Sequence, residues 1–382
     1  MANNSFPVSA LSAAVTASVV GFGGTLAIII SAAQAVGATP GQTASWITAI
    51  CLAVGIESGV LSWRYKMPIV AAYSTAGAAL IGATTGVSME NAVGAFIVAA
   101  VLLIITGLIK PLTDLVSRIP QSIAAAMLAG VLIAFPMNAA KNAVAEPMLL
   151  LPLVLLFLVL RRFVPTLAAI GVLFGGIALA FVLGRINLTS SLGFAHFEFV
   201  TPGFNPTIML GLGVPLYLVT MASQNLPGLA VLNTYGYQPK AGNLISFTGL
   251  VALLSAPFCA STTNLSAITA AICIEPQAHP DKDKRWITGI IYAGCYFIFA
   301  LFGASITGLI STVPFALIIM VAGLALLAPL MGAITLAMKD EATRFPAIVT
   351  LTVTASAIVV YGVGAAFWGL AAGLAALLIA KK

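Results

Sequence analysis

Charged side chains are scarce in this chain of 382 residues. Asp, Glu, Lys and Arg make up 7% of it, whereas 61% is hydrophobic and the mean hydropathy is +1.12. A soluble globular protein carries about 25% charged residues, so the composition excludes a water-facing surface of ordinary size. We therefore expect an all-α integral membrane protein with the lipid bilayer as its solvent, because a helix satisfies its own backbone polar groups.

The few ionisable residues also lack the clustering that catalysis or metal binding needs. Both histidines, His196 and His279, fall in predicted loops, and Glu57 is the only acid within a predicted span. The four cysteines have no C-x-x-C spacing, and the basic residues are scattered rather than gathered in a patch. The sequence predicts no catalytic residue, no metal, no cofactor and no nucleic-acid partner. No ATPase motif is present either, which favours a secondary carrier.

Apolar runs divide the chain into fourteen predicted membrane spans, each near the roughly 20 residues that a spanning helix needs. They cover residues 10–36, 43–62, 67–85, 91–109, 119–136, 147–162, 165–184, 207–226, 242–258, 261–275, 286–306, 313–335, 345–362 and 365–380. With both termini in the cytoplasm, 14 of the 16 Lys and Arg residues fall on that side, and only Lys141 and Arg185 fall in outer loops. This bias follows the positive-inside rule. The first apolar run has no positive charge before it, so we expect no cleaved signal peptide.

Two pairs of similar segments suggest that the chain consists of two halves. STAGAALIGA (74–83) resembles STTNLSAITA (261–270) at an offset of 187 residues. IPQSIAAAMLAGVL (119–132) resembles VPFALIIMVAGLAL (313–326) at an offset of about 194. Because each half has an odd number of spans, seven, the second half begins on the opposite side and the repeats are inverted. Transporters built from inverted repeats place the substrate site near the midplane.

The spans at 67–85 and 261–275 are unusual, since an extended stretch precedes Ser and Thr in each. Ser and Thr favour helix N-caps, so we expect two half-helices, entered by extended chain, whose N-termini meet near the bilayer centre. A helix N-terminus offers unpaired N–H groups and a partial positive charge. The predicted anion site therefore needs no cationic side chain; its residues are Ser74, Thr75, Ser261, Thr262, Thr263 and Asn264.

A further polar group, Ser223, Gln224 and Asn225, lies at the end of the span 207–226. We interpret these side chains as a third wall of the substrate cavity. The alternative is that they make polar contacts between helices beside a Pro-Gly break.

Aromatic side chains near the predicted site are candidates for stacking on a ring of the substrate. Tyr73 precedes the first half-helix and is the strongest of them. Phe247 and Phe258 are neighbours that either join it or pack in the core.

Several motifs carry a family resemblance over essentially the whole chain. They are VTMASQNLPGLAVL (219–232), LSAITAAIC (265–273), AHPDKDKRW (278–286), STAGAAL (74–80), SIAAAMLAGVL (122–132), GASITG (303–308) and AFWGL (366–370). They closely resemble the benzoate–proton symporter family, which is similar in fold to nucleobase permeases and sulfate-type anion carriers. The resemblance implies a core domain (residues 1–110 and 201–312) that moves against a gate domain (111–200 and 313–382). It also implies homodimers through the gate domain.

The resemblance implies import of benzoate or a related aromatic carboxylate with protons across a bacterial cytoplasmic (inner) membrane. Nucleobase carriers place carboxylates where this chain has Ser223 and Thr263, and the absence of fixed negative charge suits an anion. Glu57 is the candidate proton carrier, because burial favours its neutral form. Its position within two turns of Arg64 equally permits pairing with Arg64 or access to water.

Other functions stay open. An inorganic-anion or nucleobase carrier of the same fold would be inhibited by sulfate, bicarbonate or uracil rather than benzoate. A passive anion channel would pass single-channel current. The charged loop 278–286 is either a solvated connector or, through Asp281, Lys282, Asp283 and Arg285, a latch of the inner gate.

Overall fold

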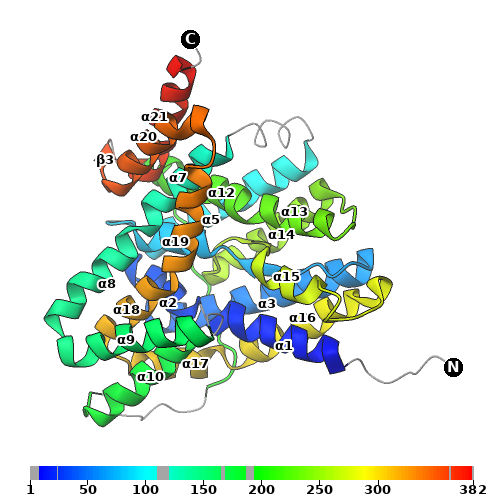
Figure 1. The fold of residues 1–382 in the computed structure, drawn as a ribbon, viewed down its shortest axis with the longest axis horizontal. Coiled ribbons are helices and arrows are strands. Elements are labelled where there is room, and N and C mark those ends of the chain that lie inside the picture. The colour runs from blue at the N-terminus through cyan, green and yellow to red at the C-terminus, as the bar shows by residue number, and fades with distance from the viewer. Residues whose placement is uncertain are drawn as a thin grey trace.

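The computed structural model describes residues 8–23, 25–109, 120–164, 168–185, 193–360 and 363–380, and over these ranges the chain is mostly helical (Figure 1). The first half contains α1 (Val8–Gly23), α2 (Leu26–Ala35), α3 (Pro40–Tyr65), β1 (Ala71–Tyr73), α4 (Thr75–Gly82), α5 (Met89–Leu108), α7 (Gln121–Leu132), α8 (Ala134–Ala145), α9 (Pro147–Phe163) and α10 (Ala168–Val182). Lys110, Arg118, Lys381 and Lys382, four of the basic residues used to orient the chain, lie outside the described residues.

The second half begins with a helical run that changes its winding and ends with a short hairpin and helix. It contains α11 (Pro206–Ile208), η2 (Met209–Gly213), α12 (Val214–Thr220), η3 (Met221–Asn225), α13 (Leu226–Thr234), α14 (Ala241–Ser255), η4 (Ala256–Phe258), β2 (Thr263–Leu265), α15 (Ile268–Ile274), η5 (Lys282–Lys284), α16 (Trp286–Leu301), α17 (Gly303–Ser311), α18 (Phe315–Ala325), α19 (Leu327–Ala337), η6 (Glu341–Thr343), α20 (Arg344–Ala355), β3 (Val359–Val360), β4 (Val363–Gly364) and α21 (Ala365–Ala380).

Within the described ranges, seven helices are long and apolar enough to cross a membrane. They are Val8–Ala35, Pro40–Tyr65, Met89–Leu108, Gln121–Ala145, Pro206–Asn233, Ala241–Phe258 and Phe315–Ala337. Lys282–Leu301 and Gly303–Leu309 form an eighth if a pair bent by 58° is one span. Other predicted spans hold shorter helices, such as α9 with 17 residues and α10 with 15. The count of fourteen crossings therefore stays a prediction.

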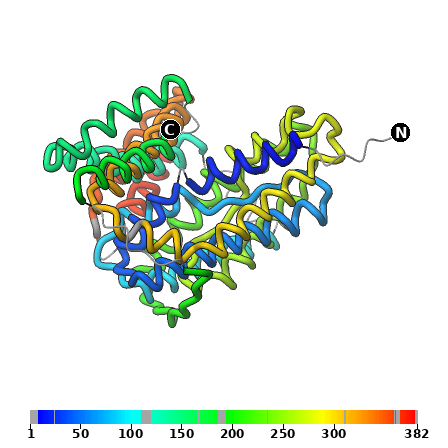
Figure 2. The backbone as a smooth tube through the Cα atoms, turned by 90° about the horizontal axis from the view of Figure 1, so that it is seen from below, coloured from blue at the N-terminus to red at the C-terminus, as the bar shows by residue number. Residues whose placement is uncertain are grey.

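The helices pack as two groups (Figure 2). The larger group comprises residues 8–108 and 206–311, in which α3 packs on α16, α5 on α14 and α1 on α16. The smaller group comprises residues 121–182 and 315–380, in which α7 packs on α20, α8 on α18 and α9 on α10. Figure 2 shows the green α9 and α10 together with the orange α18 and α19 at one end, and the blue α1 beside the yellow α16 at the other. The groups meet where α18 contacts α2 and where α7 contacts α4 and η3.

A short antiparallel ribbon joins the two halves of the sequence inside the larger group. Strands β1 and β2 pair with the register Ala71↔Leu265, Ala72↔Asn264 and Tyr73↔Thr263. Hydrogen bonds from Ser74 N to Thr262 O (3.0 Å) and from Ser266 N to Val70 O (2.9 Å) extend the pairing at both ends. Each strand leads into a short helix, α4 or α15, so the prediction of extended chain followed by a half-helix in both spans is confirmed.

The positions of these elements correct the register of the predicted repeat. From Ala71 to Thr263, the first residues of β1 and β2, is 192 residues, and from Thr75 to Ile268, the first residues of α4 and α15, is 193. From Gln121 of α7 to Phe315 of α18 is 194. The offset of 187 that matched Ser74 with Ser261 is therefore wrong by about five residues, and Ser74 corresponds to Ser266.

The loop 278–286 is anchored within the larger group. Arg285, 7% exposed, donates from Nη1 to Ile274 O (3.0 Å) at the end of α15. Lys282 Nζ donates to Gly236 O (2.9 Å), and Tyr237 OH donates to Lys282 O (2.9 Å). Burial raises the pKa of Tyr237, so its hydroxyl remains a donor at neutral pH. These contacts brace the larger group in this conformation instead of latching it to the smaller one.

Candidate functional site

One edge of the ribbon has its backbone groups satisfied by serines of α3. In lipid, an unpaired N–H or C=O costs several kcal/mol, so a strand edge there needs partners within the protein. Ser58 Oγ accepts from Ala71 N (2.9 Å). Ser62 Oγ accepts from Ile69 N (3.1 Å) and donates to Ile69 O (2.8 Å). The serines lie one turn apart, so one face of α3 supports the whole entry to β1.

The other edge of the ribbon is satisfied by Asn225. Its Oδ1 accepts from Leu265 N (2.9 Å), and its Nδ2 lies 3.5 Å from Met221 Sδ. The side chain is fully buried. We predicted a wall of the substrate cavity here; in the structure both ends of the amide hold the backbone of β2 and its own helix.

At the start of α4, three hydroxyls form a buried cluster. Ser74 Oγ accepts from Gly77 N (3.0 Å), which caps the helix, and also from Thr220 Oγ1 (3.2 Å). Thr220 Oγ1 lies 3.0 Å from Thr262 Oγ1. All three side chains are at most 1% exposed. Hydroxyls rotate and can donate to an added acceptor, so this hydroxyl cluster (Ser74, Thr220 and Thr262) is suited to a carboxylate without any cation.

The start of α15 has a different cap from the one that the sequence predicted. Ser261 and Thr262 were expected to begin this helix, but residues 263–265 pair with β1 and the helix begins at Ile268. Ser266 Oγ is the acceptor, at 3.2 Å from Thr269 N and 2.6 Å from Thr269 Oγ1. The cap prediction is therefore wrong, because strand pairing claimed the residues assigned to the first turn.

The two helix starts lie at opposite ends of the ribbon. Ser74 is bonded to the level of Thr262, and Ser266 to the level of Val70, four residues further along β1. At 3.4 Å per residue the two caps are roughly 14 Å apart. They do not meet at one point, as the sequence analysis expected, so the hydroxyl cluster at the α4 end is the more compact candidate site.

Tyr73 points away from this cluster. Its OH pairs with the Thr25 hydroxyl and donates to Phe22 O (3.3 Å), at the break between α1 and α2. Tyr73 is 3% exposed, and Thr75 beside it is half-buried. In this conformation the phenol ties β1 to the break rather than presenting a face for stacking.

The two phenylalanines named from the sequence lie in ordinary packing environments. Phe258 makes edge-on contacts with Phe197 and Phe199, at 5.8 and 6.1 Å between ring centroids. Phe247 is partly buried against the core. Neither lines the cavities described below.

Glu57 is fully buried behind the ribbon. Its Oε1 accepts from Thr263 Oγ1 (2.5 Å), and its Oε2 has no hydrogen-bonding partner among the described residues. Arg64 is exposed and lies over the Tyr65 ring (5.8 Å). The expectation that Glu57 pairs with Arg64 or reaches water does not hold here, because the Glu57 face of α3 lies inside the larger group.

Two further predicted residues have buried oxygens without partners in the described part of the chain. They are Ser261 Oγ and Asn264 Oδ1, in side chains at most 1% exposed. Asn264 Nδ2 donates to Leu265 O (2.8 Å). Unsatisfied buried polar atoms are rare in folded proteins and commonly mark functional positions.

The helical run from α11 to α13 widens at η2 and η3, two π-helical turns. Such turns occur frequently at functional sites. Within η3, Ser223 Oγ donates to Val219 O (2.5 Å), and Gln224 is half-buried. Ser223 lines a cavity of about 520 Å³ together with Gln121, Leu218, Ala222 and other residues of α7, α13, α19 and α21. Binding sites for small molecules typically have about 300–1,000 Å³.

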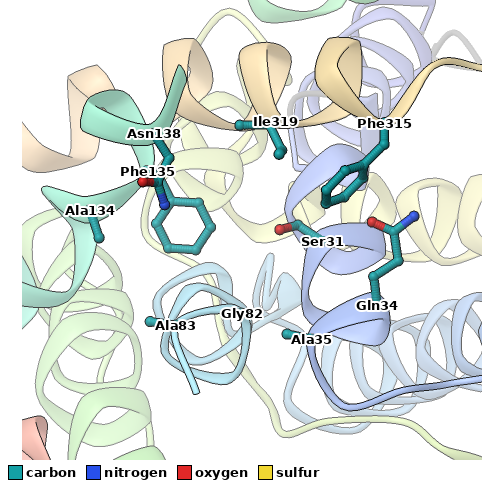
Figure 3. Close-up of a pocket in the computed structure, with 10 residues that line it drawn as sticks. All are labelled: Ser31, Gln34, Ala35, Gly82, Ala83, Ala134, Phe135, Asn138, Phe315 and Ile319. Atoms are coloured by element: carbon teal, nitrogen blue, oxygen red, sulfur yellow. The ribbon is translucent and has the colours of Figure 1, made fainter. Parts of the chain in front are cut away.

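Two smaller cavities lie on the same boundary between the helix groups. One, about 140 Å³, is lined by Ile208 and Leu212 on the same helical run and by residues of α4, α7, α20 and α21. Residue 210 lies 14 residues before residue 224 at the larger cavity, or roughly 20 Å along the axis. The other, about 240 Å³, is lined by Ser31, Gln34 and Phe135, and Figure 3 shows Phe135 and Phe315 on opposite sides of it. Between the cavities lie α12 and the start of α4.

The sequence analysis missed two residues of this arrangement. Thr220 lies in an apolar run, where only its neighbours in space reveal the hydroxyl cluster. Ser266 could have been found by applying the offset of about 194, taken from the segments at 119 and 313, to Ser74.

Comparisons with known proteins agree with the membrane setting of this site. A family model described as benzoate membrane transport protein matches residues 4–379. The inner membrane protein YdcO of Escherichia coli is 39% identical over 372 residues, covering 97% of this chain and 95% of that protein. The benzoate membrane transport protein of Acinetobacter baylyi is 34% identical over 377 residues, covering 98% of this chain and 96% of that protein.

Among solved structures, the chain is similar to the transmembrane domain of the cyanobacterial bicarbonate transporter BicA. The TM-score is 0.57 at 15% identity, with 98% of this chain and 97% of the other covered. At this identity the likeness concerns the fold alone.

Proposed function

The chain belongs to the benzoate membrane transport protein family, and from this premise we propose that it imports benzoate or a related aromatic carboxylate with protons. The membrane is the bacterial cytoplasmic membrane, in which the relative YdcO is described as an inner membrane protein. Both termini face the cytoplasm, in keeping with the distribution of Lys and Arg.

The proposed binding site for the carboxylate is the hydroxyl cluster. Three neutral donors and the N-terminus of α4 attract an anion, and removal from water strengthens each of these interactions. Ser261 and Asn264, with their unpartnered oxygens, are adjacent in sequence to Thr262 and Thr263 and extend the site. Thr75 and Gln224 are half-buried neighbours. Ser223 lines the cavity of about 520 Å³, whose mostly apolar walls suit an aromatic ring.

The transport cycle that we propose is alternating access. The larger group acts as the core domain and the smaller group as the gate domain, each built from both halves of seven-span inverted repeats. Cavities at opposite ends of the run α11–α13, separated by the start of α4, are the arrangement from which relative movement of two domains would expose the site to one side at a time. We further propose homodimers through the gate domain.

The single observation that carries this proposal is the placement of the hydroxyl cluster between the cavities, in a chain of this family. The test is uptake of radiolabelled benzoate into proteoliposomes with an inward proton gradient. Accumulation that disappears when a protonophore collapses the gradient supports it. Equal uptake with and without the gradient contradicts the proton coupling, and no uptake above empty liposomes contradicts the cargo.

The alternative cargo is an inorganic anion or a nucleobase, carried by the same fold. The similarity to a bicarbonate transporter is the observation behind it. Competition separates the two: excess bicarbonate, sulfate or uracil should leave benzoate uptake unchanged, whereas 4-substituted benzoates should inhibit it. Single-channel current in planar bilayers would instead identify a passive anion channel.

A further inference from the structure

Glu57 lies on the opposite side of the ribbon from any route between the two helix groups. Helix α3 packs on α2, α14, α16, α17, η4 and the two strands, all in the larger group. Glu57 does not line any of the three cavities. A substrate moving between the groups would therefore not contact it directly.

The surroundings of Glu57 suit a neutral carboxyl better than an ionised one. One oxygen has a single hydroxyl donor and the other has no partner among the described residues. An ionised carboxylate buried in this way would lack most of the hydrogen bonds that offset its loss of water. A proton on Oε2 removes the charge and leaves Oε1 to accept from Thr263.

No fixed positive charge compensates Glu57 from the elements packed around it. The titratable side chains on those elements are Tyr73 of β1, Tyr292, Cys295 and Tyr296 of α16, and Cys259 after η4, with Cys51, Arg64 and Tyr65 on α3 itself. Tyr and Cys are ordinarily uncharged near neutral pH. Arg64 is exposed at the end of α3, about 10 Å along the helix axis from Glu57.

The partner of Glu57 connects it to the proposed anion site. Thr263 bonds Glu57, and the preceding residue, Thr262, belongs to the hydroxyl cluster. Successive side chains of an extended chain point to opposite faces, so the carboxyl and a bound anion would be roughly 8–10 Å apart. At an effective dielectric constant near 20, a negative Glu57 would weaken anion binding roughly 20-fold.

From this geometry, and resting on the proposed function, we propose that Glu57 is the proton-binding residue of the transport cycle, separate from the anion site and coupled to it through the Thr262–Thr263 segment. Protonation removes the repulsion, so proton and anion each favour the binding of the other. The two are carried together although they never touch. Loss of the proton re-creates a buried charge, which favours release of the anion.

The test compares the wild type with Glu57→Gln, whose amide keeps the shape and an acceptor oxygen for Thr263 without a titratable proton. Between pH 6 and pH 8 the benzoate affinity of the wild type should fall, by at most about tenfold per pH unit for one linked proton. E57Q should bind benzoate equally at both pH values and exchange it across the membrane, yet not accumulate it under a proton gradient. Glu341→Gln, at an exposed position, is the matched control and should behave like the wild type. Gradient-driven accumulation by E57Q would overturn the assignment.

A second measurement does not depend on the cargo. In infrared difference spectra, the wild type without substrate should show the band of a protonated carboxyl at neutral pH, and E57Q should lack it. If this band is present while benzoate is not transported, the proposed function fails and the proton site stands. If benzoate transport is proton-driven but E57Q and the wild type have identical spectra, the proton site fails alone. Unchanged melting temperature of E57Q verifies that it is folded.

Discussion

Placing one negative charge in the hydroxyl cluster should abolish anion binding through repulsion alone. Thr262→Asp puts a carboxylate where a hydroxyl lies 3.0 Å from Thr220 Oγ1. An anion bonded to the cluster would be about two hydrogen-bond lengths away, roughly 6 Å. At an effective dielectric constant near 20 the repulsion is about 2.8 kcal/mol, or roughly 100-fold in affinity.

Thr262→Asn is the matched variant, because Asn has nearly the shape of Asp and differs in charge. The difference between T262D and T262N therefore measures the charge, whatever both lose with the threonine hydroxyl. The assay is equilibrium binding of labelled benzoate to purified protein at pH 6, 7 and 8. The gap should widen as pH rises, since the introduced Asp ionises further. Equal affinities of T262D and T262N at pH 8 would refute the placement of the anion site.

Other positions give sharper tests of the fold around the site. Ser266→Ala removes the cap of α15 and should lower stability by about 0.5–2 kcal/mol in thermal melts; an unchanged melt would mean that the cap is dispensable. Gly77→Ala places a Cβ 2.6 Å from Leu216 Cδ1, so binding should fall at least tenfold, whereas Gly332→Ala, where a Cβ meets open space, should not change it. Ala222→Trp fills the largest cavity and should block uptake while leaving the melting temperature within a few degrees; full uptake would show that the cavity is not on the route.

Hydrophobicity predicted the membrane and the general pattern of the ribbon well, because both depend on composition and local chain preference. The extended stretch before Thr75 follows from residues that precede a helix cap, and it was placed correctly. The same reasoning failed at Ser261, since nothing local distinguishes a Ser-Thr pair that starts a helix from one that enters a strand. Only the partner strand, about 190 residues away, decides between them.

Side-chain direction was the second limit. Tyr73 and Glu57 were both assigned to the right neighbourhood, yet a sequence does not say on which side of a strand or helix a residue lies. In the structure Tyr73 turns to the break at Thr25, and Glu57 turns to the back of β2. Each direction is set by packing between elements far apart in the sequence, which no local pattern records.

The ribbon has a consequence for how the protein is made. Residues 70–74 leave the ribosome about 190 residues before the segment that completes their hydrogen bonds, which at roughly 5–20 residues per second is a delay of about 10–40 s. During that time Ser58 and Ser62, already synthesised on α3, are the available partners for the N–H groups of Ala71 and Ile69. These serines would thus protect a strand in lipid before its mate exists. The first half of this protein can insert early, but it reaches its final form only when the second half arrives.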